Sequence, residues 1–171
     1  MGIYESPQYE VVKEYGDIEI RKYESYNLVT YENPDDRTSN EGFSNLFLYI
    51  SKGNEREEKI SMTVPVIDEK KSGIKTMSFV VPSKFNQDEI PLPNSDFLSI
   101  KTIKKGYFAV IRFRGNPTEK KIMDNEEKLK KFIEDKGYKV LSNYYNAFYD
   151  PPFQLPFIKK SEIMVRIEYT V

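Results

Sequence analysis

The sequence predicts an α+β fold in which two helices cover a mainly antiparallel, strongly twisted sheet. Three observations lead to this prediction. Several short runs alternate apolar and polar residues with the period of two that a half-buried strand requires. Two longer stretches carry apolar residues at helical spacing on a single face, which another layer must cover. The order of strands, helix and strands is the same in both halves of the 171 residues.

In the first half of the chain, turn residues separate the strand signals. After the turn at Gly16-Asp17, polar Glu19 and Arg21 alternate with apolar neighbours, a pattern that predicts a half-buried hairpin. A further run ends at residues 33–36, whose Asn-Pro-Asp-Asp sequence is typical of a loop. The expected strands are residues 9–12, 18–23, 26–31, 59–67 and 74–81, the last two separated by a charged turn at residues 68–73.

One helix interrupts these strands. Residues 38–40 are candidate N-caps, and Gly53 ends the helical pattern. The apolar stripe, at the i, i+3, i+4, i+7 spacing of one helix face, consists of Phe43, Leu46, Phe47 and Ile50. A stripe of this kind favours packing against the core. Leu48 and Tyr49 fall outside it, so they widen the apolar face and leave room for a second contact surface.

The second half repeats this order after a polar, proline-bearing crossover at residues 85–96. The expected strands are residues 97–103, 107–113, 138–149 and 162–169. Residues 116–119, Asn-Pro-Thr-Glu, supply an N-cap, a proline at the first helical position and an acid three residues after the cap. The apolar face of the helix that follows consists of Ile122, Leu129, Phe132 and Ile133, and Gly137 is its expected C-cap. The matching order predicts one domain, residues 1–171, built from two superposable repeats at about residues 9–81 and 97–169.

Composition excludes several classes of function. The chain has no histidine and no cysteine, so we predict neither a catalytic nucleophile pair nor a metal site of the usual kind. Lys+Arg number 26 against 27 Asp+Glu, without the positive excess that nucleic-acid binding requires. No run approaches the roughly 18 to 20 apolar residues of a transmembrane segment. Because the start carries no secretory signal, we expect a cytoplasmic protein. Because histidine and cysteine are missing, we expect a binding module rather than an enzyme.

Several sequence blocks, in order along almost the whole chain, resemble the SOUL family, the haem-binding-protein family. The most specific are residues 50–54, the Met-Thr-Val-Pro-Val block at residues 62–66 and the Tyr-Asp-Pro-Pro block at residues 149–152. The resemblance implies a distorted β-barrel flanked by two helices, with pseudo-twofold symmetry similar to gyrase-inhibitory and effector-binding domains. It also implies binding of haem or another tetrapyrrole. Relatives that bind haem carry basic residues on the first helix, whereas residues 38–51 contain no Lys or Arg.

The expected binding surface for such a ligand has two parts. The first is the helix stripe of Phe43, Leu46, Phe47 and Ile50, which could line one face of a porphyrin. The second is the loop at residues 151–158, whose apolar side chains Phe153, Leu155 and Phe157 are typical of a contact site. Lys159 and Lys160 follow directly and could pair with ligand carboxylates. Haem would then be held by hydrophobic contact without a histidine ligand.

Two other functions fit the sequence. The loop at residues 151–158 could bind a protein partner, or it could pack as a lid on the end of the barrel. Alternatively, the chain could be a small-molecule effector-binding or hydrolase domain of the gyrase-inhibitory type, which would require a deep pocket with a buried carboxylate. A haemin titration followed by absorbance separates tetrapyrrole binding from these alternatives.

Overall fold

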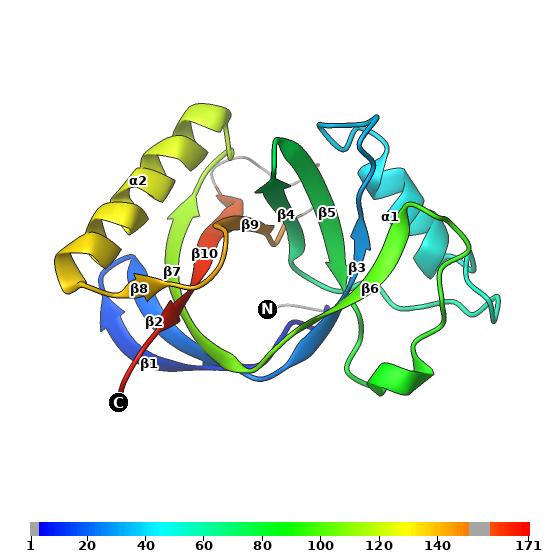
Figure 1. The fold of residues 1–171 in the computed structure, drawn as a ribbon, viewed down its shortest axis with the longest axis horizontal. Helices are drawn as coiled ribbons and strands as arrows, with labels where there is room; N and C mark the ends of the chain where they lie inside the picture. Colours follow the sequence, from blue (N-terminus) through cyan, green and yellow to red (C-terminus); the bar gives the residue numbers. More distant parts are fainter. Residues whose placement is uncertain (1–3, 151–157) are drawn as a thin grey trace. The chain divides into compact units, whose positions relative to one another are not determined.

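A computed structural model describes residues 4–150 and 158–171 (Figure 1). The chain divides into two compact units, each with a set of antiparallel strands and one α-helix. The first unit comprises the segment up to Pro7 together with Ser25–Lys104. The second unit comprises Gln8–Glu24 together with Lys105–Val171.

The first unit is a four-stranded antiparallel sheet with the order β4-β5-β3-β6, and α1 packs on β3 and β5. Its elements are β3 (Tyr26–Tyr31), α1 (Gly42–Ile50), β4 (Val66–Lys71), β5 (Ile74–Val80), the 3-10 turn η1 (Gln87–Glu89) and β6 (Leu98–Ile103). The central strand β3 pairs on both sides, with Leu28 opposite Val80 of β5 and Lys101 of β6.

The second unit is an antiparallel sheet with the order β1-β2-β7-β10-β9, to which β8 adds by pairing with β10. Its elements are β1 (Tyr9–Tyr15), β2 (Ile18–Tyr23), β7 (Gly106–Arg114), α2 (Glu119–Lys136), β8 (Lys139–Val140), β9 (Tyr145–Phe148) and β10 (Lys160–Glu168). Helix α2 packs along β7 and β10 (Figure 1).

The two units have the same strand order, but they do not coincide with the two halves of the sequence. In each unit, the strand before the helix pairs with the last strand after it: β3 pairs with β5, and β7 pairs with β10. The matching strand orders are β6-β3-β5-β4 and β2-β7-β10-β9. The first strand of each order comes from the other half of the sequence. β2 lies in the first half but pairs with β7, and β6 lies in the second half but pairs with β3. The hairpin at residues 9–23 therefore folds with the second unit.

Helix boundaries follow capping interactions that the sequence only partly indicates. At α2, Thr118 is the N-cap and its side chain accepts the Lys121 N–H at 3.2 Å. The helix thus begins two residues later than an N-cap at Asn116 would place it, and it ends at Gly137 (φ 71°), as predicted. At α1, none of residues 38–40 is the N-cap; the Asp36 carboxylate accepts the N–H groups of Asn40 and Glu41 instead.

Two predicted strands are shorter than expected. The strand predicted at residues 59–67 begins only at Val66, and before it Lys59 and Thr63 make isolated bridges. Proline at position 65 has no N–H to donate to a ladder, which accounts for the late start. The run predicted at residues 138–149 divides into β8 and β9.

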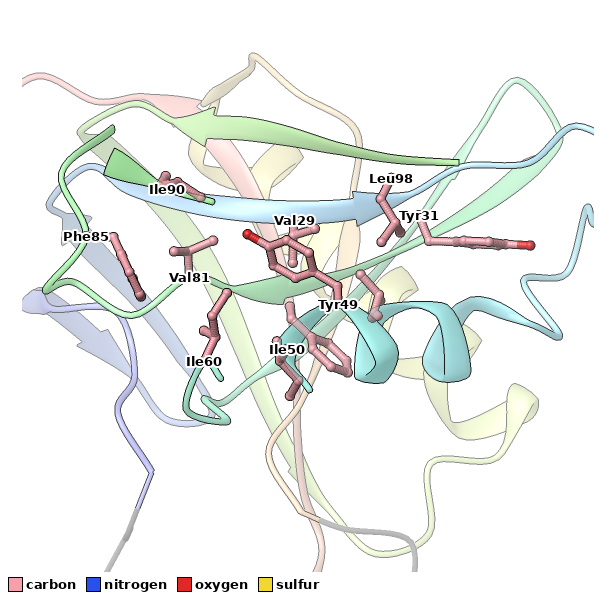
Figure 2. Packing of buried hydrophobic residues seen from close by; sticks show 11 residues of the cluster. Val29, Tyr31, Tyr49, Ile50, Ile60, Val81, Phe85, Ile90 and Leu98 are labelled. Carbon is pink, nitrogen blue, oxygen red and sulfur yellow. The ribbon is translucent and has the colours of Figure 1, made fainter. Parts of the chain in front are cut away.

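The core of the first unit contains a different face of α1 from the one the spacing predicts. Leu46, Tyr49 and Ile50 are buried, whereas Phe43 and Phe47 are 47% and 52% exposed. The core interpretation of the stripe is therefore wrong for Phe43 and Phe47, and it omitted Tyr49. The Tyr49 ring lies in the core (Figure 2). Its hydroxyl donates to the Pro91 carbonyl at 2.6 Å, so this buried polar group is paired.

Each unit has its own cluster of buried apolar side chains. In the first unit the cluster consists of Val29, Tyr31, Leu46, Tyr49, Ile50, Ile60, Phe79, Val81, Phe85, Ile90 and Leu98 (Figure 2). In the second unit it consists of Ile20, Ala109, Ile111, Phe113, Leu129, Ile133, Ile163, Val165 and Ile167. Of the described helices, neither combines the length and hydropathy that crossing a bilayer requires.

Two leucines of α1 test this assignment of its faces. Leu46 is 0% exposed and Leu48 is 65% exposed. We expect Leu46→Ala to lower the free energy of unfolding by about 2 to 5 kcal/mol, because it leaves a cavity in the core. Leu48→Ala should change it by less than about 0.5 kcal/mol. Urea denaturation of both variants measures the difference, and equal effects would contradict the assignment.

Candidate functional site

Two surfaces of the described residues have the chemistry of a binding site, one in each unit. The first, the α1 face, consists of the exposed apolar side chains of α1, which are Phe43, Phe47 and Leu48. The rings of Phe43 and Phe47 lie one helical turn apart with centroids at 6.2 Å and an angle of 16° between their planes. The Phe43 ring also meets Phe79 edge-on at 5.3 Å. Exposed apolar groups gathered in this way usually mark a ligand or partner site.

Helix α1 itself, Gly42–Ile50, carries no charged side chain. The helix has no acidic residue in its first turn and no basic residue in its last turn, and the nearest lysine, Lys52, follows its C-cap. A ligand on this surface would therefore be held by apolar and aromatic contact.

The second unit contains a buried cluster of charged side chains centred on Arg21. This guanidinium donates to both carboxylate oxygens of Glu162, from Nη1 at 2.9 Å and from Nη2 at 2.6 Å, and from Nε to Glu19 at 2.7 Å. Arg21 is 1% exposed and Glu162 is 0% exposed. The strands fix this geometry because β2 carries Glu19 and Arg21 on one face, and β10 carries Glu162 across the intervening β7.

Further contacts complete the cluster. The Tyr149 hydroxyl donates to Glu162 at 2.8 Å, and Arg112 pairs with Glu19 at 2.9 Å. The Tyr9 ring lies over the Arg21 guanidinium, with its centroid at 4.2 Å. Two cations thus face two carboxylates, which makes burial of the charges tolerable.

Burial and pairing hold the protons of this cluster in place. Burial by itself lowers the pKa of Arg21, but hydrogen bonding to Glu162 and the neighbouring negative charges outweigh it and raise that pKa above its ordinary value. Burial, followed by the charge of Glu162, raises the pKa of Tyr149 well above its ordinary value. Arg21 therefore stays charged, and Tyr149 stays protonated as a hydrogen-bond donor. Neither group is available as an acid or base near neutral pH.

A pocket of about 570 Å³ opens beside this cluster, and we call it the basic pocket. Strands β1, β2, β7 and β10, the β1-β2 turn and helix α2 all contribute to its wall. Its lining consists of Tyr9, Asp17, Arg21, Arg112, Phe113, Arg114, Lys121, Asn125, Lys128 and Lys160. No group of three or more Asp and Glu side chains within the described ranges could hold a metal ion.

The binding residues predicted from sequence fall into three groups. Phe43 and Phe47 are exposed on the α1 face, whereas Leu46 and Ile50 are core residues. Phe153, Leu155 and Phe157 lie outside the described residues. Lys159 and Lys160 belong to the second unit: Lys159 donates to Asn116 at 3.4 Å, and the Lys160 ammonium lies 4.6 Å from the centroid of the Tyr149 ring.

Sequence reasoning missed the Arg21 cluster and most of the basic pocket. The alternation of Glu19 and Arg21 with apolar neighbours predicts a half-buried hairpin, in which the polar side chains face the solvent. The same alternation also fits a face buried as ion pairs, and the sequence does not show which partner a distant strand supplies. Lys121 and Lys128, seven residues apart on α2, were the available signal of a common helix face.

Comparisons with known proteins gave one matching family model and several similar solved structures. A family model described as SOUL heme-binding protein matches residues 4–166. A comparison with curated proteins gave no match. A hydrolase from Listeria innocua has a similar structure, with a TM-score of 0.62 and 10% identity over 89% of this chain and 92% of that chain. The EcmrR C-terminal domain has a TM-score of 0.65 and 12% identity over 95% of this chain and 99% of that chain.

At such low identities the structural similarity concerns the fold alone. It confirms the predicted fold class, an α+β fold with mainly antiparallel strands and two helices.

The Arg21 cluster should contribute strongly to stability. We expect Arg21→Met to lower the free energy of unfolding by about 3 to 5 kcal/mol, because it leaves two buried carboxylates without their partner. Lys120→Met is the matched control: it breaks an ion pair with Asp124 whose side chains are 85% and 56% exposed, and should change stability by less than about 1 kcal/mol. Chemical denaturation measures both, and equal losses would mean that the Arg21 pair contributes no more than a surface pair.

Proposed function

The chain belongs to the SOUL heme-binding protein family, and from that membership we propose that it binds haem or another tetrapyrrole and catalyses no reaction on it. The observation that carries the proposal is the exposure of Phe43 and Phe47 on α1. Both rings are about half exposed, at 47% and 52%, although their size and apolarity favour burial. A partner that covers them would remove this apolar surface from water.

The α1 face suits a flat apolar macrocycle better than a polar small molecule. The two rings are within 16° of parallel, one helical turn apart, and offer aromatic surface to an apolar macrocycle. Leu48, 65% exposed, is a further exposed apolar side chain of the same helix. Aromatic rings in contact gain offset or edge-on stacking energy in addition to burial of area. Since Leu46 and Ile50 are committed to the core, the proposed contact residues of the first unit are reduced to this face.

The side chains of this protein favour haem binding without a strong nitrogen ligand to the iron. The sequence contains neither histidine nor cysteine. The tyrosine hydroxyl of α1, on Tyr49, donates to the Pro91 carbonyl, and burial, followed by the charges of Glu55 and Glu58, raises the pKa of Tyr49 to about 12. Tyr49 therefore stays protonated at neutral pH and is a poor iron ligand. Contact with the macrocycle, not coordination, would then provide most of the affinity.

The two alternative functions have less support. A protein partner at residues 151–158 stays a prediction from sequence, because most of that loop lies outside the described residues. A hydrolase would need a buried carboxylate free to act as a base. Glu162 is buried, but its oxygens accept hydrogen bonds from Arg21 and Tyr149, so it is not free for that role.

Haemin titration of aromatic variants tests the proposal. Phe43→Ala and Phe47→Ala should each weaken haemin binding about 5- to 30-fold, since each ring contributes about 1 to 2 kcal/mol of apolar contact. Phe97→Ala is the matched control, because Phe97 is similarly exposed, at 46%, in the same unit but off α1. Its affinity should equal that of the wild type. The readout is the Soret shift at one-to-one saturation.

Equal weakening by Phe97→Ala would indicate nonspecific adsorption of haemin. A featureless rise in absorbance with the wild-type chain would reject tetrapyrrole binding altogether.

The spectrum of bound ferric haem provides a separate test. We expect a high-spin electron paramagnetic resonance signal at neutral pH, because the chain has no imidazole and its lysines are protonated there. A low-spin signal typical of two nitrogen ligands, recorded without added imidazole, would contradict this expectation. Such a result would leave the α1 face as a contact surface but would require two amine ligands from the chain.

A further inference from the structure

We propose that the basic pocket of the second unit binds a small anion with several oxyanion groups, either phosphates or carboxylates. Six cationic side chains line this pocket, against one acidic side chain, Asp17. Glu19 and Glu162 neutralise Arg21 and Arg112 from behind, which leaves four cations and a single carboxylate in the lining. The chain as a whole carries a formal net charge of −1, so this positive charge is a local concentration.

The end of the β2 ladder creates the pocket. Ile18 of β2 pairs with Ile111 of β7, and beyond this pair the Arg112 N–H donates to the Asp17 carbonyl of the turn. The last residues of β7 therefore continue past β2. Arg112 and Arg114 alternate there with Phe113, whose ring is buried in the cluster that includes α2 residues. Because side chains alternate along a strand, the two arginines share a face.

Helix α2 contributes the remaining part of the lining. Lys121, Asn125 and Lys128 recur at intervals of four and three residues, which places them on one side of the helix. Asn125 is only 9% exposed, and its Nδ2 donates to the Lys121 carbonyl at 2.8 Å. Lys121 lies in the first turn of α2, where the helix dipole also favours an anion.

The cationic side chains of the pocket differ in how many hydrogen bonds and ion pairs they make within the protein. Arg21 is held by Glu19, Tyr23 and Glu162, and so forms a fixed floor. Among the described residues, the Arg114 guanidinium makes one long hydrogen bond of 3.5 Å to the Ile158 carbonyl, and the Lys121 ammonium donates to the Arg114 carbonyl. Lys128 has no ion-pair partner anywhere in residues 4–150 and 158–171.

These cations indicate the class of ligand. Four cations, namely Arg114, Lys121, Lys128 and Lys160, line the pocket without a carboxylate neutralising them among the printed ion pairs of the described residues, so a ligand with two or more oxyanion groups matches their charge better than a single one. Arginine forks bind phosphate and carboxylate groups with paired hydrogen bonds, and lysines add point charges. The volume of about 570 Å³ is within the range of small-molecule sites. The residues involved differ from those of the α1 face, so this inference does not depend on haem binding.

Calorimetric titration of the full chain with pyrophosphate and, separately, with citrate tests the proposal. We expect one-to-one binding of at least one of them at low ionic strength, weakening as salt is added. The double variant Arg114→Gln with Lys128→Gln should bind it about tenfold more weakly, as expected when charge-assisted hydrogen bonds are lost. Lys131→Gln is the matched control, since Lys131 is exposed on the same helix but does not line the pocket. It should leave the affinity unchanged.

Each outcome has a definite meaning. Tighter binding of pyrophosphate would assign phosphate ligands to the pocket, and tighter binding of citrate would assign carboxylates. No heat with either anion, or equal affinities of the double variant and the wild type, would overturn the proposal, provided that the melting temperatures of the variants match. Competitive displacement of the bound anion by haemin would overturn the separateness of the two sites.

Discussion

Burial of the Arg21 guanidinium is the constraint around which the second unit is arranged. A charge that is 1% exposed requires carboxylates at short range, and Glu19 and Glu162 meet this requirement from β2 and β10. Their positions hold only in the observed register, because a shift of one residue would turn each side chain to the other face of the sheet. The ion pairs therefore specify how β2, β7 and β10 align, and the same register places Arg112 and Arg114 at the basic pocket.

The first unit depends on an apolar constraint of a different kind. Helix α1 has only nine residues, and its core contact is made by Leu46, Tyr49 and Ile50. Tyr49 supplies a large ring to the core, whereas Phe43 and Phe47 lie on the exposed part of the helix. The surface proposed for tetrapyrrole binding is thus the part of the helix that the core leaves exposed.

The two proposed sites have opposite chemistry. The α1 face has rings and no charge, which favours a ligand whose affinity comes from apolar area. The basic pocket has a surplus of cations around a neutralised floor, which favours a ligand whose affinity comes from charge. Separate residues in separate units carry these properties. Mutation of one site should therefore leave the other measurable.

The sequence by itself determined the fold class, the order of most elements and the caps that depend on local geometry, such as Gly137 with its positive φ. Periodicity is a local property, so neighbouring residues are sufficient to reveal it. It did not determine that β2 and β6 each pair with a strand from the other repeat, or that Tyr49 and not Phe47 enters the core. Nor did it reveal that Glu162 meets Arg21, 141 positions away. Only the tertiary structure decided these points, because they depend on which distant side chains share a limited buried volume and must satisfy one another's charge.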